Sequence, residues 1–266
     1  MISHLFFQVF FTFTITMAVD NCSTNDRMMW YLLIKLNRDD PILCGQLFHI
    51  HCCAHMVNLI IKEGMTVISD GIVKIRESVV FWTGSCKRMR SLKNLLVVQM
   101  LNMIKKSVLD CPIRWNFSYL MISYTLQYKN VFVRLKNIDG QYKCCPTEED
   151  WQFAIILEEN LKSFYNVTEL FSRTQYPTSN VFLQHMCEIK LSLQYWLLSP
   201  CNRIQHMTHL MLLKFDKYWQ DMSGILGVAC IFDPRYKKKF IEYYFSMVYG
   251  DEKELYVVKV VTFCRN

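Results

Sequence analysis

The segment TEEDWQFAIILEENLKSFYNVTELF, residues 147–171, carries the clearest structural pattern in the chain. Its mostly apolar inner positions recur every three or four residues, which places them on one face of an α-helix. These positions are Trp151, Ala154, Leu157, Leu161, Phe164, Thr168 and Phe171. Thr147 and Asp150 have the spacing of a capping box, which marks a helix N-terminus. The pattern therefore predicts an amphipathic helix that begins after Thr147 and is broken by Tyr176-Pro177-Thr178.

Helical spacing continues on both sides of this segment. The further predicted helices cover residues 28–36, 53–65, 67–82, 116–135, 180–198 and 205–219. A short strand is predicted over 46–50, a turn at Asp139-Gly140, and an interruption at Asp233-Pro234-Arg235. The basic stretch CKRMRSLK, residues 86–93, leads into another helix. We therefore expect an α/β fold that is predominantly helical, with a small α/β start and a long helical body.

The composition is that of a folded protein. The 266 residues are 52% hydrophobic and 20% charged, which excludes intrinsic disorder, and the length corresponds to about 1.8 domains. The net charge of +7 is compatible with a polyanionic partner. The twelve cysteines include no C-x-x-C pair, and a chain with a full core does not need a disulfide scaffold. We expect mostly buried, reduced thiols.

Residues 1–19 contain no acidic residue and no Lys or Arg. The apolar run from Leu5 to Val19 has the length of a signal peptide, but the positive charge that precedes such a run is missing. As a membrane anchor the run is short and is interrupted by Gln8 and several threonines. Phe11 to Thr16 alternates apolar residues with Thr, which is typical of a buried strand. We favour a core strand or a mis-started leader over secretion, and the secreted or membrane-tethered alternative stays open.

Two groups of residues could hold a metal ion. Asp20 follows a strand-like run, and a carboxylate at a strand end can bind a divalent cation. Cys52 and His55 lie three residues apart and could offer sulfur and nitrogen ligands to zinc. The spacing alone favours a loop aspartate in the first case, and a buried Cys with a hydrogen-bonded His in the second. No second ligand pair follows at zinc-finger spacing, so we expect no metal site from these residues.

Three basic segments could bind nucleic acid. Arg114-Trp115 precedes a predicted helix, and Arg can pair with phosphate while Trp can stack on an unpaired base. The other two segments are charge runs that could neutralise phosphates, although such runs more often form a solvated helix face. They consist of Lys87, Arg88, Arg90 and Lys93, and of Arg235, Lys237, Lys238 and Lys239.

Nine segments in the same order resemble hAT-family transposases, in particular the plant RICESLEEPER-like group, which carries a BED-type zinc finger. The matching segments are VDNCSTND (19–26), LFHIHCCAHMVNLIIKEG (47–64), IRESVVFWTGS (75–85), LDCPIRWNFSYLM (109–121), EEDW (148–151), FYNVTELFS (164–172), YPTSN (176–180), KFDKYW (214–219) and FDPRYKKKF (232–240). They extend over most of the chain, and their shared order makes the resemblance specific.

The resemblance implies a ribonuclease-H-like fold with a helical insertion that acts on DNA by two-metal strand transfer. It divides the chain into an apolar leader or core strand (1–19), a partial ribonuclease-H-like region (20–140), a helical hAT-like region (146–251) and a tail (252–266). Asp20 would match the second catalytic carboxylate of the family, and Cys52 and His55 its C-x-x-H motif. Trp115 would match the tryptophan associated with a flipped base, with Arg114 near the DNA backbone.

Departures from the family pattern argue against catalysis. Strand transfer needs three carboxylates to hold the two metals, yet residues 1–19 contain none, and the last glutamate of the family lies in a dimerising segment beyond this chain. The BED finger is also missing, and Ile113 and Phe117 alter the TRWNS motif. We expect a transposase truncated at both ends.

The leading hypothesis is therefore a nuclear, transposase-derived DNA-binding protein without catalytic activity, cofactor or small-molecule substrate. It would form a homo-oligomer only with the missing C-terminal segment. The alternative is an active transposase or nuclease that other segments complete, with Mg²⁺ or Mn²⁺ in its active site.

Overall fold

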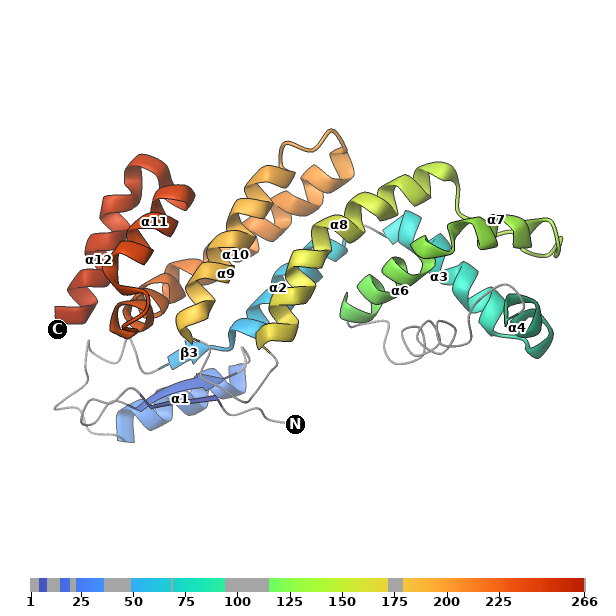
Figure 1. Cartoon of the computed structure of the whole chain (residues 1–266). Coiled ribbons are helices and arrows are strands. Elements are labelled where there is room, and N and C mark those ends of the chain that lie inside the picture. Colours follow the sequence, from blue (N-terminus) through green and yellow to red (C-terminus); the bar gives the residue numbers. More distant parts are fainter. Residues whose placement is uncertain are drawn as a thin grey trace. The chain divides into compact units, whose positions relative to one another are not determined.

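A computed structural model gives the architecture of the chain and describes residues 5–8, 15–19, 23–35, 49–67, 69–93, 115–171 and 179–265. These residues are predominantly helical (Figure 1), which confirms that part of the predicted fold class. The helices are α1 (Ser23–Lys35), α2 (Cys53–Met65), α3 (Ser69–Thr83), α4 (Cys86–Lys93), α6 (Trp115–Gln127), α7 (Lys129–Lys136), α8 (Glu148–Phe171), α9 (Ser179–Trp196), α10 (Asn202–Phe232), α11 (Lys237–Tyr249), the short 3₁₀ helix η2 (Gly250–Glu252) and α12 (Lys253–Arg265).

The described strands form one small sheet in the order β1-β2-β3. Strand β1 (Leu5–Gln8) pairs antiparallel with β2 (Ile15–Val19), and β2 pairs parallel with β3 (His49–His51). In the register, Ala18 lies opposite both Leu5 and Ile50. Strand β2 overlaps the end of the segment in which the sequence favours a strand, and β3 overlaps the end of the strand predicted over 46–50.

The chain divides into two compact units that interleave along the sequence. Unit 1 consists of residues 1–60, 167–198 and 208–266, and unit 2 of residues 61–166 and 199–207. Both units are assembled from segments that are separated in the sequence, whereas the regions that the resemblance implies are consecutive. The two divisions cannot be compared directly, and the regions stay a prediction.

The core of unit 1 is aromatic. Phe171 at the end of α8 stacks on Phe182 of α9, with ring centroids 3.6 Å apart. Lys190 of α9 lies 3.0 Å from the Asp216 carboxylate of α10, and its ammonium faces the ring of Tyr249 in α11 at 5.1 Å. The indole N–H of Trp219 donates a hydrogen bond to the same tyrosine hydroxyl. These contacts join α9, α10 and α11.

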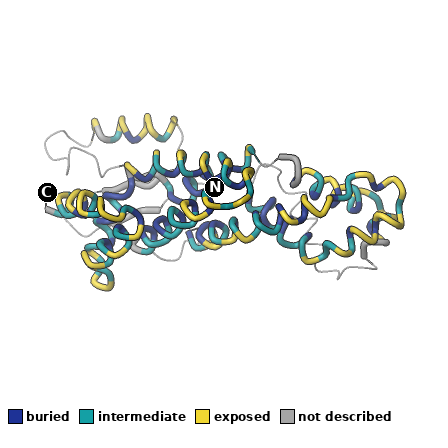
Figure 2. Tube along the Cα trace, turned by 90° about the horizontal axis from the view of Figure 1, so that it is seen from above, coloured by how far each residue is buried: buried dark blue, intermediate teal, exposed yellow. Residues whose placement is uncertain are grey.

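The core of unit 2 is built around two buried tryptophans. Trp82 of α3 meets Tyr142 edge-to-face at 5.4 Å, and Trp151 of α8 lies 6.2 Å from Phe132 of α7. Figure 2 shows how buried positions recur along one side of the helices while exposed positions occupy the other. The apolar positions predicted within residues 151–171 are all buried, which confirms the amphipathic helix.

Several predicted boundaries need correction. Helix α2 has the predicted bounds, but the single helix predicted over 116–135 is two helices that meet at Tyr128. Residues 86–93 form the helix α4 themselves, whereas the sequence suggested that they lead into one. Helix α10 continues to Phe232, thirteen residues past the predicted end at Trp219, and stops at the predicted interruption beginning with Asp233.

The nine described cysteines are all free, but the expectation that most would be buried is wrong, because only three of the nine are. Cys53, Cys187 and Cys230 are buried, and burial raises the pKa of Cys230 to about 12. Among the helices of the described residues, none combines the length and the apolar character that crossing a membrane requires.

Candidate nucleic-acid interface

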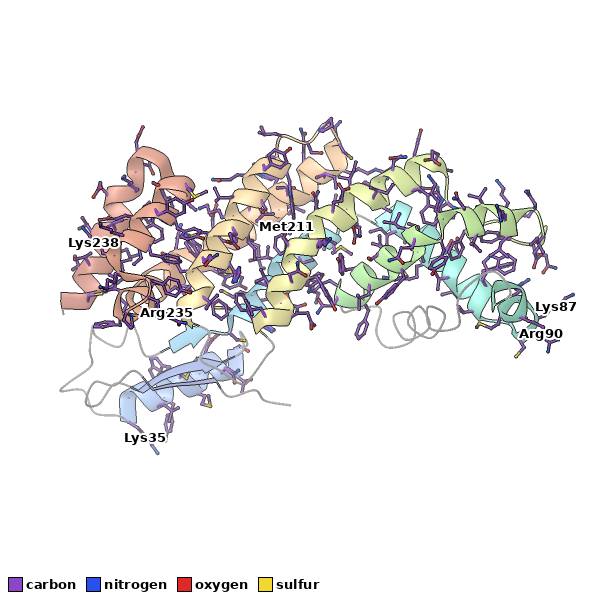
Figure 3. All side chains as sticks on the ribbon, in the orientation of Figure 1. Lys35, Lys87, Arg90, Met211, Arg235 and Lys238 are labelled. Atoms are coloured by element: carbon purple, nitrogen blue, oxygen red, sulfur yellow. The ribbon has the colours of Figure 1, made fainter. Side chains whose placement is uncertain are left out.

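Helix α4 exposes basic side chains on a short, anchored element. Its sequence CKRMRSLK contains four basic residues and no acidic one. Met89 is 7% exposed, and its backbone N–H donates a 2.7 Å hydrogen bond to the Ser85 carbonyl. Because Met89 faces the core, Lys87 and Arg90 extend into solvent, as Figure 3 shows. The positive charges of these two residues are therefore accessible to a phosphate backbone.

Arg88 faces the protein. Its guanidinium lies 3.7 Å from the centre of the Phe81 ring in α3, a cation–π contact. Its Nε donates a 3.0 Å hydrogen bond to Asp139, and one terminal nitrogen donates a 2.7 Å bond to the Gln141 side chain. The planar guanidinium thus ties α4 to the loop that follows α7. Arg88, one of the four basic residues of this stretch, is thus engaged within the protein.

Asp139 organises the loop from its other side. The Gln141 backbone N–H donates a 2.9 Å hydrogen bond to Oδ1 of Asp139, which closes the turn predicted at Asp139-Gly140. The pKa of Asp139 lies below its ordinary value because of this backbone hydrogen bond and the one from Arg88, with a smaller contribution from the charge of Lys87. The carboxylate therefore stays ionised and holds Arg88 throughout the physiological pH range.

The second basic run begins at the break between α10 and α11, in unit 1. Both Asp233 oxygens accept hydrogen bonds from the Arg235 guanidinium, the shorter at 2.8 Å. Lys237 is exposed and has a positive φ of 59°. Lys238 is exposed and lies 2.9 Å from Glu242, one helical turn further along α11. Two of the positive charges in this run are thus each compensated by a carboxylate of their own, Arg235 by Asp233 and Lys238 by Glu242.

The residues weighed as possible metal ligands were Asp20, Cys52 and His55. Cys52 directly precedes α2, and His55 lies in its first turn, partly buried. Within the described ranges, no group of three His, Cys, Asp or Glu side chains could hold a metal ion. Asp20 lies outside the described residues. The described residues thus do not fit a two-metal centre.

Trp115 is at the start of α6 and is 4% exposed. Nearby on the same helix, the Ser118 hydroxyl accepts a 2.8 Å hydrogen bond from Arg76 of α3, which fixes α6 within unit 2. A base could stack on the Trp115 ring only after the start of α6 moved. Arg114 lies outside the described residues.

Sequence reasoning missed the loop beside α4. Residues 137–143 join α4 through Asp139 and Gln141, and Lys136 and Lys143 at its two ends are exposed. A count of charge over 129–145 would have revealed this segment, because it holds four basic residues and a single acidic one.

Comparison with known proteins finds a matching family model for each of two segments of the chain. The model of the ZBED1 RNase-like helical domain matches residues 50–160, and the model of the hAT-like transposase with RNase-H fold matches residues 180–266. The "Putative AC transposase" of Zea mays is 36% identical over 91% of this chain. The chain belongs to the hAT transposase family. Helix α4 and the loop 137–143 therefore lie in the segment that matches the helical domain.

Other relatives of this hAT-family chain carry BED-finger names. "Zinc finger BED domain-containing protein RICESLEEPER 2" of Oryza sativa subsp. japonica is 33% identical over 94% of the chain, which covers 34% of that protein. "Zinc finger BED domain-containing protein DAYSLEEPER" of Arabidopsis thaliana is 30% identical over 54% of the chain and 21% of its own length. The chain covers 30% of the Zea mays protein. It thus spans about a third of the length of the first relatives. No solved structure matches it.

Proposed function

We propose that this hAT-family chain is a transposase-derived protein that binds duplex DNA through α4 and does not cut it. The observation that carries the proposal is the orientation of α4. Its apolar Met89 and its internally paired Arg88 face the protein, so that Lys87 and Arg90 face solvent on a helix without acidic residues. Phosphate contacts of this kind give sequence-independent affinity and orient a protein on the duplex. Because the proposed partner is DNA, we expect the protein to act in the nucleus and to use no small-molecule substrate.

The absence of catalysis is proposed from the acidic residues. Under the resemblance, Asp20 supplies one of three carboxylates, and residues 1–19 contain no other candidate. One carboxylate cannot hold two divalent cations against solvent and their mutual repulsion. A partial ribonuclease-H-like core would then serve as a scaffold. Arg114 and Trp115 belong to the proposal through the resemblance, as a base-binding pair that requires movement of α6.

An active enzyme is the second candidate, because the chain covers only about a third of a relative named as a transposase. The remaining carboxylates would then come from segments outside these 266 residues. Such an enzyme would form a homo-oligomer through one of those segments.

Fluorescence anisotropy with a labelled 30-base-pair duplex tests the proposed binding. We expect saturable binding by the purified chain at 50 mM salt, and weaker binding by the Lys87→Gln/Arg90→Gln variant. A Lys62→Gln/Lys162→Gln variant, which removes two exposed lysines elsewhere in unit 2, is the control. Failure of the purified chain to bind the duplex would refute the proposal.

Incubation of the same duplex with Mg²⁺ or Mn²⁺ tests the absence of catalysis. The proposal predicts intact DNA after prolonged incubation. Metal-dependent strand cleavage that disappears in Asp20→Asn would instead establish the active-enzyme candidate.

A further inference from the structure

Two short segments carry an excess of positive charge as large as the net charge of the whole chain. Residues 86–93 and 129–145 together contain eight of the 30 Lys and Arg residues and one of the 23 Asp and Glu residues, so the rest of the chain holds 22 of each sign. These 25 residues therefore have a formal net charge of +7, which equals the net charge of the whole chain. An excess of this size over so few residues makes a local positive potential.

The two segments meet in the folded chain. Arg88 of the first segment bonds to Asp139 and Gln141 of the second, 51 and 53 residues later. Phe81, on which Arg88 lies, also stacks on Tyr142 with ring centroids 5.2 Å apart. Together with the contact of Trp82 with Tyr142, these side-chain contacts hold the loop 137–143 against α4 and the end of α3.

Ion pairing distinguishes the cations that are compensated from those that are available. Lys129 lies 2.6 Å from Glu148, and Arg88 lies 3.0 Å from Asp139, so both of these charges are balanced locally. Arg90, Lys136 and Lys143 are exposed, and among the described residues no carboxylate lies within ion-pair distance of them. Lys87 of α4 is exposed as well, and its charge interacts with the Asp139 carboxylate.

We propose that Lys87 and Arg90 of α4, Lys136 at the end of α7 and Lys143 of the loop form one composite phosphate-binding surface for duplex DNA, which we call the α4–loop surface. Arg88 acts as the positioning residue of this surface. Its guanidinium donates hydrogen bonds to Asp139 and Gln141 and so keeps the loop adjacent to α4. The inference rests on the proposed function and deepens it, since neither Lys136 nor Lys143 follows from the basic run on α4.

The salt dependence of duplex binding tests the contribution of the loop. Each phosphate contact on B-DNA adds about 0.9 to the slope of log K against log salt. Between 50 and 200 mM salt, we expect Lys136→Gln/Lys143→Gln to lower the magnitude of this slope by about 2 relative to the unmodified chain. The control Lys62→Gln/Lys162→Gln removes the same charge at two exposed positions of unit 2, one on α2 and one on α8, and should leave the slope nearly unchanged.

The outcomes separate the two proposals. If the loop variant keeps the original slope while Lys87→Gln/Arg90→Gln loses about 2, α4 binds DNA alone and the composite surface is refuted while the proposed function stands. If the unmodified chain does not bind the duplex, the proposed function itself fails. Tighter binding of a duplex RNA of the same length would overturn the assignment to DNA.

Arg88→Lys tests the positioning role, because it keeps the charge but loses the planar group that reaches Phe81, Asp139 and Gln141 together. We expect the loop substitutions to lower the slope by less in the Arg88→Lys background than in the unmodified chain, since the loop is no longer held beside α4. A merely structural arginine would lower stability without changing this difference. Equal slope changes in both backgrounds would refute the positioning role.

Discussion

At the residue scale, one carboxylate oxygen shows how α8 begins. Oδ2 of Asp150 accepts 2.8 Å hydrogen bonds from the Thr147 backbone N–H, the Thr147 hydroxyl and the Lys74 ammonium. In return, the Asp150 N–H donates to the Thr147 hydroxyl oxygen at 3.3 Å. The capping box thus satisfies helix donors that would otherwise lack partners, and Lys74 of α3 attaches it to the rest of unit 2.

Replacement of the capping threonine should destabilise unit 2. Thr147→Ala removes the oxygen that accepts the Asp150 N–H, and we expect the free energy of unfolding to fall by about 1 kcal/mol. Urea denaturation followed by circular dichroism measures the change. Glu149→Ala is the control, because Glu149 is exposed in the same turn. Equal losses in the two variants would show that the box does not stabilise the helix.

The pH dependence of Asp150 follows from its surroundings. Burial raises the pKa of this carboxyl, but the hydrogen bonds from Lys74 and Thr147 outweigh it, so that the pKa lies below the ordinary value of 3.8. A lowered native pKa stabilises the fold above the unfolded pKa, and the stabilisation is lost as pH falls through the native pKa. The difference in unfolding free energy between the unmodified chain and Asp150→Asn should be constant from about pH 7 to 5 and shrink below 3.8. A constant difference down to pH 3 would contradict this account.

The capping box could be predicted from the sequence because all its partners lie within four residues. Its attachment to Lys74 could not, because that residue is 76 positions away. The same limit explains Arg88, whose charge was predicted correctly but whose partners lie 51 and 53 residues further along. Sequence identifies the chemistry of a side chain more readily than its direction.

At the element scale, α10 and α12 approach each other at a glycine. A Cβ atom at Gly227 of α10 would lie 2.6 and 2.7 Å from the two γ-methyl carbons of Val260 in α12, and 3.3 Å from its Cβ. Since both methyls and Cβ crowd the same point, rotation of the valine side chain cannot relieve the contact. Glycine at this position therefore permits the packing of the two helices.

Gly227→Ala should destabilise the chain although alanine favours helix by about 0.5–1 kcal/mol. Overpacking costs about 1–3 kcal/mol, so we expect a net loss on the order of 1 kcal/mol in the free energy of unfolding. In the Val260→Ala background the same substitution should cost less or become stabilising. If Gly227→Ala stabilises the unmodified chain, the close approach of α10 and α12 is wrong.

Element boundaries show where periodicity stops being informative. Thr125 of α6 and Phe132 of α7 are both buried and are seven residues apart, which is the spacing of two turns in an unbroken helix. The pattern therefore could not reveal the break at Tyr128, where neither Gly nor Pro occurs. The extension of α10 was readable, because Met222, Leu226 and Cys230 continue the buried face of that helix.

At the scale of the whole molecule, the family and the charge balance could be predicted from the sequence, whereas the α4–loop surface could not. The ordered motifs gave the hAT family, which the family models and relatives confirm. The basic run on α4 gave half of the proposed DNA-binding surface. The other half depends on a fold that brings 137–143 to α4, and no local pattern encodes that contact.

The most direct test of the account compares two variants with the same net charge. One is Lys87→Gln/Arg90→Gln/Lys136→Gln/Lys143→Gln on the α4–loop surface, and the other is Arg27→Gln/Lys62→Gln/Lys162→Gln/Lys217→Gln at exposed positions on other helices. Their duplex affinities are measured by anisotropy from 50 to 200 mM salt. We predict that the first variant loses about 3 to 4 in the slope of log K against log salt and the second about 1 or less. Equal losses would show that net charge alone attracts DNA and would contradict a dedicated surface.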